Sequence, residues 1–531
     1  MKKIIKFCKV NSFLLWILVC GFSLRIYYLV RKSGDLFVAN LGGDSCYHYN
    51  VATNIASGLG PKTSFIFSYW FYHPEIPAYT DLYGPGYAAF LSIFLLFSDN
   101  FFSLRLANFL IGFTSIVITY FIGKKIHSKQ LGLISAFFIS VNFFHIENST
   151  VVMREIYTLL LTQLFFLILF FISDKKKIFI FIIGLVTGLI SLTTGIWPLY
   201  ILILIFYIVL YIKKISLKYI FIFSAGFLIS SIRWIIITKT YFGKIYYSNL
   251  SFYPYVESWS RMMLDKGLPE IDNFWNTINF SEYISNHFFW FIENLYKGSM
   301  YLTPTFVYFL SLLLIPLIFF GAIKLKKIGF ILLTFSIIYF LGLSFASYAL
   351  NGNLWPRHYL PILMNASLLL GVTILEIINY LSKKYAVLNN KKIPISIIVI
   401  AFFITIFGIE YKTSYWEKND KPFYEFGEKI KKVTSNDDVI MYSVAVPDVW
   451  CVTGRRVVHD IAFGGGKEKN RLQSEIDKYN VSYILVDLSE KNYTFSSQKL
   501  AKVLKNYQNQ KLEEIIQDKD NGYFLYKINI K

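Results

Sequence analysis

Long apolar runs separated by short polar loops dominate this chain, and they predict a bundle of membrane-spanning helices. At about 1.5 Å of rise per residue, eleven runs are long enough to cross or nearly cross a hydrocarbon core about 30 Å thick. A twelfth run, 83–97, is shorter and opens with Gly84-Pro85-Gly86, so the pattern leaves its crossing open. The eleven runs lie at 10–30, 101–122, 131–146, 153–173, 178–193, 195–212, 218–238, 299–321, 328–350, 358–380 and 393–410.

Clusters of lysine between these runs decide the predicted topology. If 83–97 does not cross, five lysine-rich loops fall on the same side as the amino terminus, as the positive-inside rule requires. We therefore interpret 83–97 as a juxtamembrane or re-entrant helix. The amino terminus is then cytoplasmic and the carboxyl terminus extracytoplasmic, and the first run is an uncleaved signal anchor. The five loops are 123–130, 174–177, 213–218, 323–327 and 382–392.

The same pattern divides the chain into a membrane domain, 1–410, and a tail, 411–531. Two long outer loops, 31–100 and 239–297, belong to the membrane domain. In the tail, helix-like runs alternate with strand-like runs, which predicts a small soluble α/β domain. The expected fold class is an all-α polytopic membrane protein with this domain at its carboxyl end. The helix-like runs are 423–433, 467–479 and 496–507, and the strand-like runs are 439–444, 481–486 and 523–528.

The composition agrees with a membrane protein and limits the classes of molecule that the chain could bind. Of the 531 residues, 55% are hydrophobic, more than a soluble domain could keep from water. The net charge of +20 resides largely in the lysine clusters, so we expect contact with anionic lipid and no binding of nucleic acid. The four cysteines match no zinc-site spacing. Cys46 and Cys451 share the predicted outer side and could pair, but two free thiols are the favoured interpretation.

The first outer loop places one carboxylate beside a predicted span. Asp44 has two interpretations that can hold together: it caps the helix that follows it, and it acts as a general base that takes a proton from an acceptor hydroxyl. Apolar side chains recur every four residues beyond it, which predicts a short amphipathic helix lying flat on the bilayer. These side chains are Tyr47, Val51, Ile55 and Leu59.

Two further features of this loop have a structural and a functional interpretation. His48 either binds a metal together with Asp44 or, as we favour, lies on the wet face of the helix. The segment 74–90 is rich in Pro, Gly and Tyr. It is either a tight turn entering an apolar helix or a rigid aromatic wall, formed by Tyr83 and Tyr87, beside a sugar or a carrier lipid.

Several arginines near the predicted outer ends of spans are candidates for binding phosphate, because a guanidinium makes bidentate, charge-assisted hydrogen bonds. The alternative is snorkelling to lipid headgroups. Arg357 is the preferred candidate, because Pro356 fixes it at the start of a helix with His358 and Tyr359. The other arginines are Arg105, Arg154 and Arg233; Glu147, Arg154 and Glu155 share one outer turn, where they either pair or form a second wall of a site.

The order of these motifs resembles the GT-C superfamily of membrane glycosyltransferases. Within it, the chain is most similar to the protein O-mannosyltransferase and aminoarabinose-transferase type, which uses polyprenyl-phosphate-linked sugars. The chain departs from that pattern where Ser45 replaces a second acid and where the WWD signature of oligosaccharyltransferases is missing. The resemblance covers roughly 10–380 and rests on Gly43-Asp44 with Tyr47, Ala52 and Gly58, on the turn Tyr83–Tyr87, and on Arg105, Arg154-Glu155 and Arg357-His358-Tyr359.

The resemblance implies an outward-facing active site in which Asp44 is the catalytic carboxylate. The implied reaction is direct, inverting transfer of a hexosyl or pentosyl group from a polyprenyl phosphate to an extracytoplasmic protein, lipid or cell-envelope glycan. Since arginine makes the carrier phosphate a good leaving group, no cofactor is required and no metal site is expected. The implied donor- and substrate-binding residues are Arg357, His358, Tyr359, Arg105, Arg154, Glu155, Tyr83, Tyr87 and His48.

Three other functions stay open at this point. An oligosaccharyltransferase-like enzyme with a pyrophosphate-linked donor would need a metal. A transporter or lipid flippase would usually show inverted repeats, and we find none. A membrane scaffold that presents the tail would not depend on Asp44.

Overall fold

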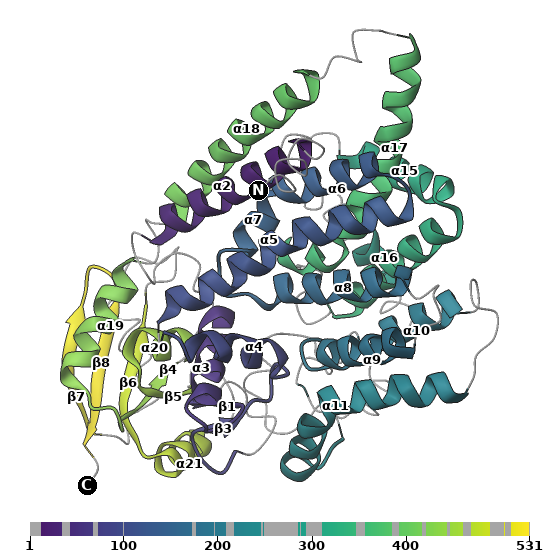
Figure 1. Ribbon diagram of the computed structural model, residues 1–531. Coiled ribbons are helices and arrows are strands. Elements are labelled where there is room, and N and C mark those ends of the chain that lie inside the picture. The colour runs from purple at the N-terminus through teal and green to yellow at the C-terminus, as the bar shows by residue number, and fades with distance from the viewer. Residues whose placement is uncertain are drawn as a thin grey trace. The chain divides into compact units, whose positions relative to one another are not determined.

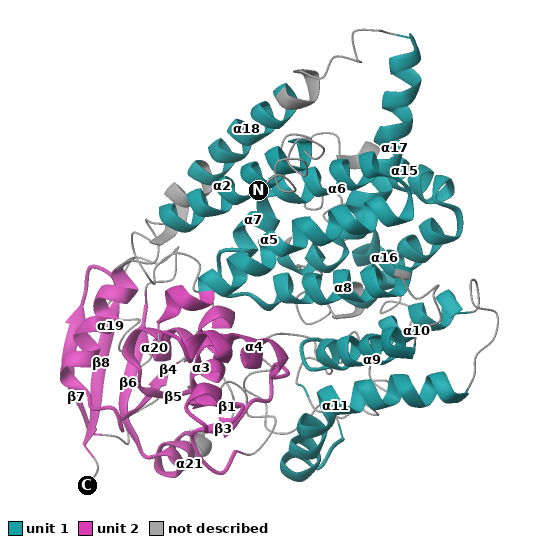
Figure 2. Cartoon of the chain, in the orientation of Figure 1, with its two compact units in different colours: residues 1–32, 105–255, 272–412 teal, residues 33–104, 256–271, 413–531 magenta. Residues whose placement is uncertain are grey.

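A computed structural model of the chain has two compact units, and each is described by itself (Figure 2). Unit 1 comprises 1–32, 105–255 and 272–412, and unit 2 comprises 33–104, 256–271 and 413–531. The structure describes residues 12–33, 43–66, 73–98, 100–171, 177–195, 197–208, 217–245, 248, 285–286, 288–293, 311–346, 356–384, 392–416, 421–442, 446–459, 469–488, 504 and 511–529.

Unit 1 is helical, and a described helix overlaps each of the eleven predicted runs (Figure 1). By length and apolar composition, five helices in the described parts could cross a membrane: Ser12–Arg31, Phe101–Ile126, Leu217–Phe242, Lys326–Leu343 and Arg357–Lys384. The helices are α2 (Ser12–Ser33), α5 (Phe101–Ile126), α6 (Lys129–Val141), α7 (Phe143–Asn148), α8 (Arg154–Phe171), α9 (Lys177–Ser191), α10 (Trp197–Tyr207), α11 (Leu217–Phe242), α15 (Ser311–Lys324), α16 (Lys326–Ala346), the 3-10 helix η6 (Pro356–Ile362), α17 (Leu363–Lys384) and α18 (Lys392–Trp416).

The predicted run 131–146 is divided between two helices. Asn142 has an extended backbone, with φ −70° and ψ 119°, which ends α6. Its side chain accepts a hydrogen bond from the backbone N–H of His145 at 2.9 Å and so caps the start of α7. The prediction of one continuous helix here is wrong, because a side-chain cap replaces the helical hydrogen bonds at this position.

Unit 2 joins the first outer loop to the tail in one mixed sheet. Its strand order is β2-β5-β4-β6-β8-β7, in which the first four strands are parallel and the last two antiparallel. The elements are α3 (Gly43–Ala56), β1 (Lys62–Thr63), β2 (Phe65–Ile66), β3 (Ala78–Tyr79), α4 (Gly86–Leu95), α19 (Lys421–Val433), β4 (Val439–Tyr442), α20 (Val446–Thr453), β5 (Arg456–His459), α21 (Lys469–Tyr479), β6 (Val481–Asp487), β7 (Lys511–Asp518) and β8 (Tyr523–Asn529).

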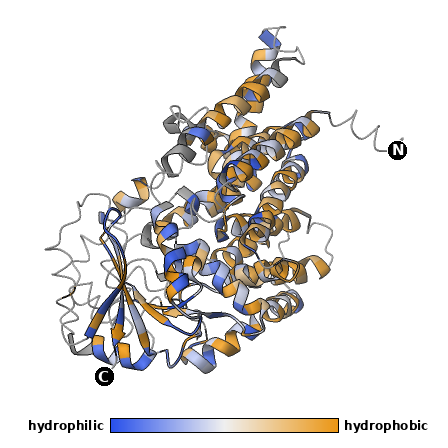
Figure 3. Ribbon diagram, turned by 90° about the vertical axis from the view of Figure 1, so that its left-hand side faces the viewer, coloured by the Kyte–Doolittle hydropathy of each residue, from blue (hydrophilic) through white to orange (hydrophobic). Residues whose placement is uncertain are grey.

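Buried apolar side chains of the central strands build the core of this sheet. Met441, Val458 and Ile484 are completely or almost completely buried on one face, where they pack with Leu472 and Ile476 of α21. Figure 3 shows both hydrophobic and hydrophilic residues in the strands, whereas the helices of unit 1 are largely hydrophobic. Consecutive side chains of β4 and β6 are buried, so both faces of these parallel strands are covered, as is usual for parallel strands.

The predicted fold class is confirmed, because a helical membrane-type unit and a small α/β sheet are both present. The three predicted strands correspond to β4, β6 and β8. The predicted helix 496–507 and the second outer loop, 239–297, lie mostly outside the described residues. The run 83–97 forms α4, whose ten residues measure about 15 Å, half the thickness of a hydrocarbon core.

Candidate active site

Asp44 lies in the first turn of α3, in unit 2, and its side chain is partly exposed. A carboxylate in the first turn interacts favourably with the positive end of the helix dipole. The expectation that the apolar stripe of α3 rests on the bilayer is wrong for Tyr47 and Val51, whose exposed fractions are 2% and 1%. Because α4 and α20 pack against α3, this stripe faces protein.

The Asp44 carboxylate contacts one member of a cluster of tyrosine and histidine rings. The Tyr83 hydroxyl donates a hydrogen bond to Asp44 Oδ1 at 2.6 Å. The His48 ring stacks on Tyr83 with 5.1 Å between centroids and meets the Tyr87 ring edge-on at 4.9 Å. The structure therefore brings together Asp44, His48, Tyr83 and Tyr87, as the sequence indicated. The expected wet position of His48 is wrong, since the side chain is buried among these rings.

Tyr47 packs against this cluster through Tyr83. Its ring packs edge-on against Tyr83 at 5.1 Å, and its hydroxyl shares a hydrogen bond with Thr80. Burial raises the pKa of the Tyr47 hydroxyl well above its ordinary value, so the group stays neutral at physiological pH. A neutral, packed ring fixes Tyr83 without adding a competing charge near Asp44.

A second cluster, in unit 1, centres on the buried Glu155 carboxylate. Glu155 Oε1 lies 3.7 Å from Arg154 Nε, 3.7 Å from Arg357 Nε and 3.6 Å from His358 Nδ1. The first turn of α8 and the 3-10 helix η6 supply these groups. Two guanidiniums facing one carboxylate leave a surplus positive charge, which suits an anion such as a phosphate.

The remaining predicted residues of unit 1 have structural contacts. Arg105 is buried, and its Nε donates to the Thr150 carbonyl at 2.8 Å, which steadies the turn before Arg154. Tyr359 is fully buried and packs against the Phe340 ring at 5.8 Å. Glu147 accepts a hydrogen bond from the Tyr28 hydroxyl at 3.3 Å.

Sequence reasoning overlooked Arg25, which is completely buried in α2. Its guanidinium donates to the carbonyls of Gly21 at 2.7 Å and Ser140 at 3.2 Å, and it contacts His145 Nδ1 at 2.5 Å. Arg25 thus satisfies carbonyls at the end of α6 and anchors α7. The available signal was a lone arginine inside an apolar run, which is costly unless it has partners.

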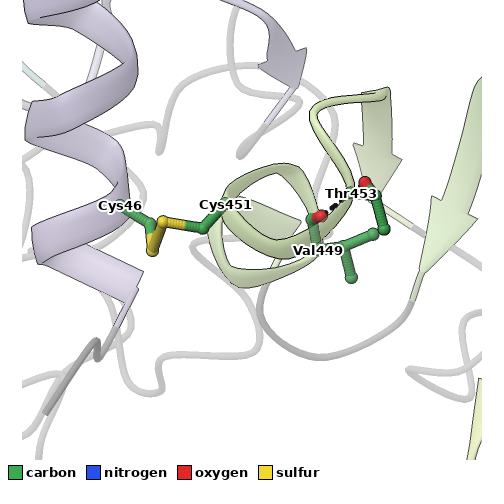
Figure 4. The surroundings of a disulfide bond; sticks show 4 residues. All are labelled: Cys46, Val449, Cys451 and Thr453. Carbon is green, nitrogen blue, oxygen red and sulfur yellow. Dashed lines mark hydrogen bonds between the residues drawn. A yellow bond between two sulfur atoms is a disulfide. The ribbon is translucent and has the colours of Figure 1, made fainter. Parts of the chain in front are cut away.

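Cys46 and Cys451 form a disulfide, so the favoured interpretation of two free thiols is wrong (Figure 4). They lie 405 residues apart in sequence, but α3 and α20 bring their Cα atoms to 5.5 Å. That distance lies within the range that a disulfide spans. Sequence alone offered no spacing signal, because the pairing depends on how two distant helices pack.

Within the described parts of the chain, no group of three or more His, Cys, Asp or Glu side chains could hold a metal ion. The absence of a required metal therefore stays an expectation from the sequence.

No family model matches this sequence, and no curated protein is significantly similar to it. Solved structures, in contrast, share its fold. ArnT from Cupriavidus metallidurans bound to undecaprenyl phosphate is 11% identical, with a TM-score of 0.58, and the match covers 98% of this chain and 97% of ArnT.

The archaeal oligosaccharyltransferase of Archaeoglobus fulgidus is also similar. Its apo form is 14% identical, with a TM-score of 0.58, over 90% of this chain and 69% of that chain. The same enzyme, AglB, in complex with an inhibitory peptide and a dolichol-phosphate is 13% identical, with a TM-score of 0.55, over 90% and 70%. Both neighbours are GT-C glycosyltransferases, so this chain has the GT-C fold that its motifs resembled.

Proposed function

We propose that this chain is a membrane glycosyltransferase that moves a sugar from a polyprenyl-phosphate donor to an extracytoplasmic acceptor. The observation that carries the proposal is the partly exposed Asp44 carboxylate, held by Tyr83 at the head of α3 in a chain with the GT-C fold. Support for a lipid-phosphate donor comes from ArnT, a neighbour along nearly its whole length, whose structure holds undecaprenyl phosphate.

In the proposed reaction, Asp44 accepts the proton of an acceptor hydroxyl. The acceptor oxygen forms a bond to the anomeric carbon of the sugar while the bond from that carbon to the phosphate oxygen breaks. The leaving polyprenyl phosphate keeps the electron pair, and direct displacement inverts the anomeric centre. The hydrogen bond from the Tyr83 hydroxyl fixes one oxygen of the Asp44 carboxylate.

The cluster of Arg154, Glu155, Arg357 and His358 is the proposed phosphate-binding group. Its surplus positive charge would stabilise the negative charge that develops on the leaving phosphate. Glu155 has a positioning role in this proposal, since it holds both guanidinium groups within 3.7 Å of one oxygen. The acceptor is a hydroxyl of a protein, lipid or cell-envelope glycan.

The test replaces Asp44 by Asn in a strain that lacks the native protein. Loss of the base should lower transfer about 100-fold or more, so a polyprenyl-phosphate sugar accumulates and can be identified by mass spectrometry of lipid extracts. Asp437→Asn is the matched control, because this side chain is 93% exposed on the tail. Full transfer by purified Asp44→Asn from the accumulated lipid would contradict the proposal.

An oligosaccharyltransferase-like reaction with a pyrophosphate-linked donor is the second candidate. The equal TM-score of the archaeal oligosaccharyltransferase favours it, whereas the match covers only 69% of that enzyme. Such a reaction should stop when a chelator removes divalent metal. Chelator-resistant transfer from a monophosphate-linked sugar excludes it.

A further inference from the structure

The tail helix α20 packs along the first two turns of the helix that bears Asp44. Three contacts recur at intervals of three residues on α3, which places them on one helix face. Cys46 is bonded to Cys451, and the Tyr49 ring meets the Trp450 ring edge-on at 5.5 Å. At the start of the helix, a Cβ added at Gly43 would lie 3.8 Å from Pro447.

The sheet of unit 2 holds α20 firmly. This helix connects β4 to β5, which pair in parallel from Val439 to Tyr442 and from Arg456 to His459. Val449 and Val452 of α20 are buried. A Cβ at Gly427 would lie only 2.6 Å from Val452, so α19 covers α20 at close range. Because the sheet and α19 both pack against α20, we expect this helix to be rigid.

The Asp44 carboxylate is therefore restrained from two directions. The Tyr83 hydroxyl fixes its side chain, and the disulfide fixes its backbone two residues further along α3. Without the disulfide the first turn of α3 would fray more readily, because the first backbone N–H groups of a helix lack helical hydrogen-bond partners.

We propose that the Cys46–Cys451 disulfide and α20 position the Asp44 carboxylate for transfer, so that the tail is part of the catalytic machinery. This inference rests on the proposed function and extends it. Cys46 and Cys451 are positioning residues, because they act on the reaction through α3. A tail that served only as a binding domain for an acceptor would not need a covalent bond to this helix.

The first experiment measures the helix directly. Purified full-length protein is compared by hydrogen exchange before and after treatment with a phosphine, which breaks the S–S bond to give two thiols and is itself oxidised to the phosphine oxide, water supplying the oxygen and the protons. We expect amide exchange in 43–56 to become about tenfold faster, while α21 is unchanged. Unchanged exchange in 43–56 would overturn the inference.

The second experiment measures the transfer step in cells. The double variant Cys46→Ser/Cys451→Ser should accumulate the same lipid-linked sugar as Asp44→Asn, at a protein level equal to that of the wild type. Cys20→Ser is the matched control, since Cys20 is a free cysteine buried in α2. Wild-type transfer by the double variant overturns the inference, as does alkylation of Cys46 and Cys451 in protein that has never been reduced.

The two experiments separate this inference from the function it rests on. If α3 loosens on reduction but Asp44→Asn accumulates no lipid-linked sugar, the proposed function fails and the disulfide still positions α3. If Asp44→Asn accumulates the sugar but α3 does not loosen, only the positioning role fails. If the double variant does not fold, reduction of folded wild-type protein supplies both measurements.

Discussion

The hydroxyl of Tyr83 donates a hydrogen bond to Asp44 Oδ1 at 2.6 Å. Tyr83→Phe keeps the ring that stacks on His48 and removes the hydrogen bond to Asp44. We expect transfer to fall about tenfold, since a carboxylate that has lost this hydrogen bond samples orientations that do not reach the acceptor. The rate is measured with the lipid that accumulates in the deletion strain.

A matched control exists on the tail sheet, where the Tyr526 hydroxyl donates to Glu514 at 3.1 Å. Tyr526→Phe removes a comparable tyrosine–carboxylate bond in the same unit and should leave the transfer rate unchanged. Equal losses in the two variants would mean that the effect comes from the stability of unit 2 and not from Asp44.

Tyr442 makes the stability of unit 2 sensitive to alkaline pH. Its hydroxyl donates to Asp487 at 2.8 Å, and burial raises its pKa well above the ordinary value. Below the pKa of an unfolded tyrosine, about 10, both states hold the proton and the native hydrogen bond contributes fully. As pH rises above that value the unfolded state loses its proton first, so stability falls.

Tyr442→Phe should therefore reduce the drop in thermal unfolding midpoint between pH 8 and pH 11. At pH 8 the same variant should cost about 1 kcal/mol through the lost hydrogen bond. Differential scanning fluorimetry of the purified protein at the two pH values measures both effects. An alkaline drop as large as that of the wild type would show that Tyr442 is not one of its sources.

Candidate site residues could be singled out from the sequence where a charged side chain lies near the end of an apolar run. Asp44 and Arg357 each place a charged group near the end of an apolar run, and that combination alone marked them. The burial of His48 and the pairing of Cys46 with Cys451 were not predictable, because both depend on which helices pack together. Arg25 was overlooked although its position in an apolar run carried the signal.

At the scale of elements, glycines allow helices α9 and α11 to approach closely. A Cβ at Gly184 would overlap the Phe223 carbonyl, and one at Gly226 would overlap the Phe181 carbonyl. Small residues at such crossings let backbones pack without intervening side chains, which is a common device in membrane helices.

Gly226→Leu should separate α9 from α11 and destabilise unit 1 by about 1–3 kcal/mol, because the added side chain has no space. Gly342→Leu in α16 is the control, since nothing lies within 4 Å of a Cβ there. Thermal unfolding in detergent compares the two variants. Identical unfolding midpoints would show that the α9–α11 crossing does not limit stability.

Strands that contain a continuous run of apolar residues were predictable from the sequence. Strands that form only because they pair with a distant segment were not. β6 carries four consecutive buried side chains, from Tyr483 to Val486, and two of them, Ile484 and Val486, pack in the main core. β2 has only two residues, and its pairing with β5 comes from the distant end of the chain. β7 exposes most of its charged side chains at the sheet edge, so its pattern suggested no strand.

At the scale of the whole molecule, the lysine pattern predicts which side of the membrane each loop occupies. A reporter enzyme that is active only outside the cytoplasm should give activity when fused after residue 60 or after residue 420. Fusions after residue 127 or after residue 326 should be inactive, since lysine-rich loops stay inside. Activity from the fusion after residue 127 would reverse the predicted topology.

The bond between Cys46 and Cys451 also constrains how often the chain crosses the membrane. Both sulfur atoms must reach the same oxidising compartment, so the number of crossings between them must be even. Ten of the predicted runs lie between the two cysteines, which satisfies this parity. A crossing at 83–97 would make eleven and leave one sulfur in the reducing cytoplasm. The disulfide thus tests, independently of the lysine pattern, whether 83–97 crosses the membrane.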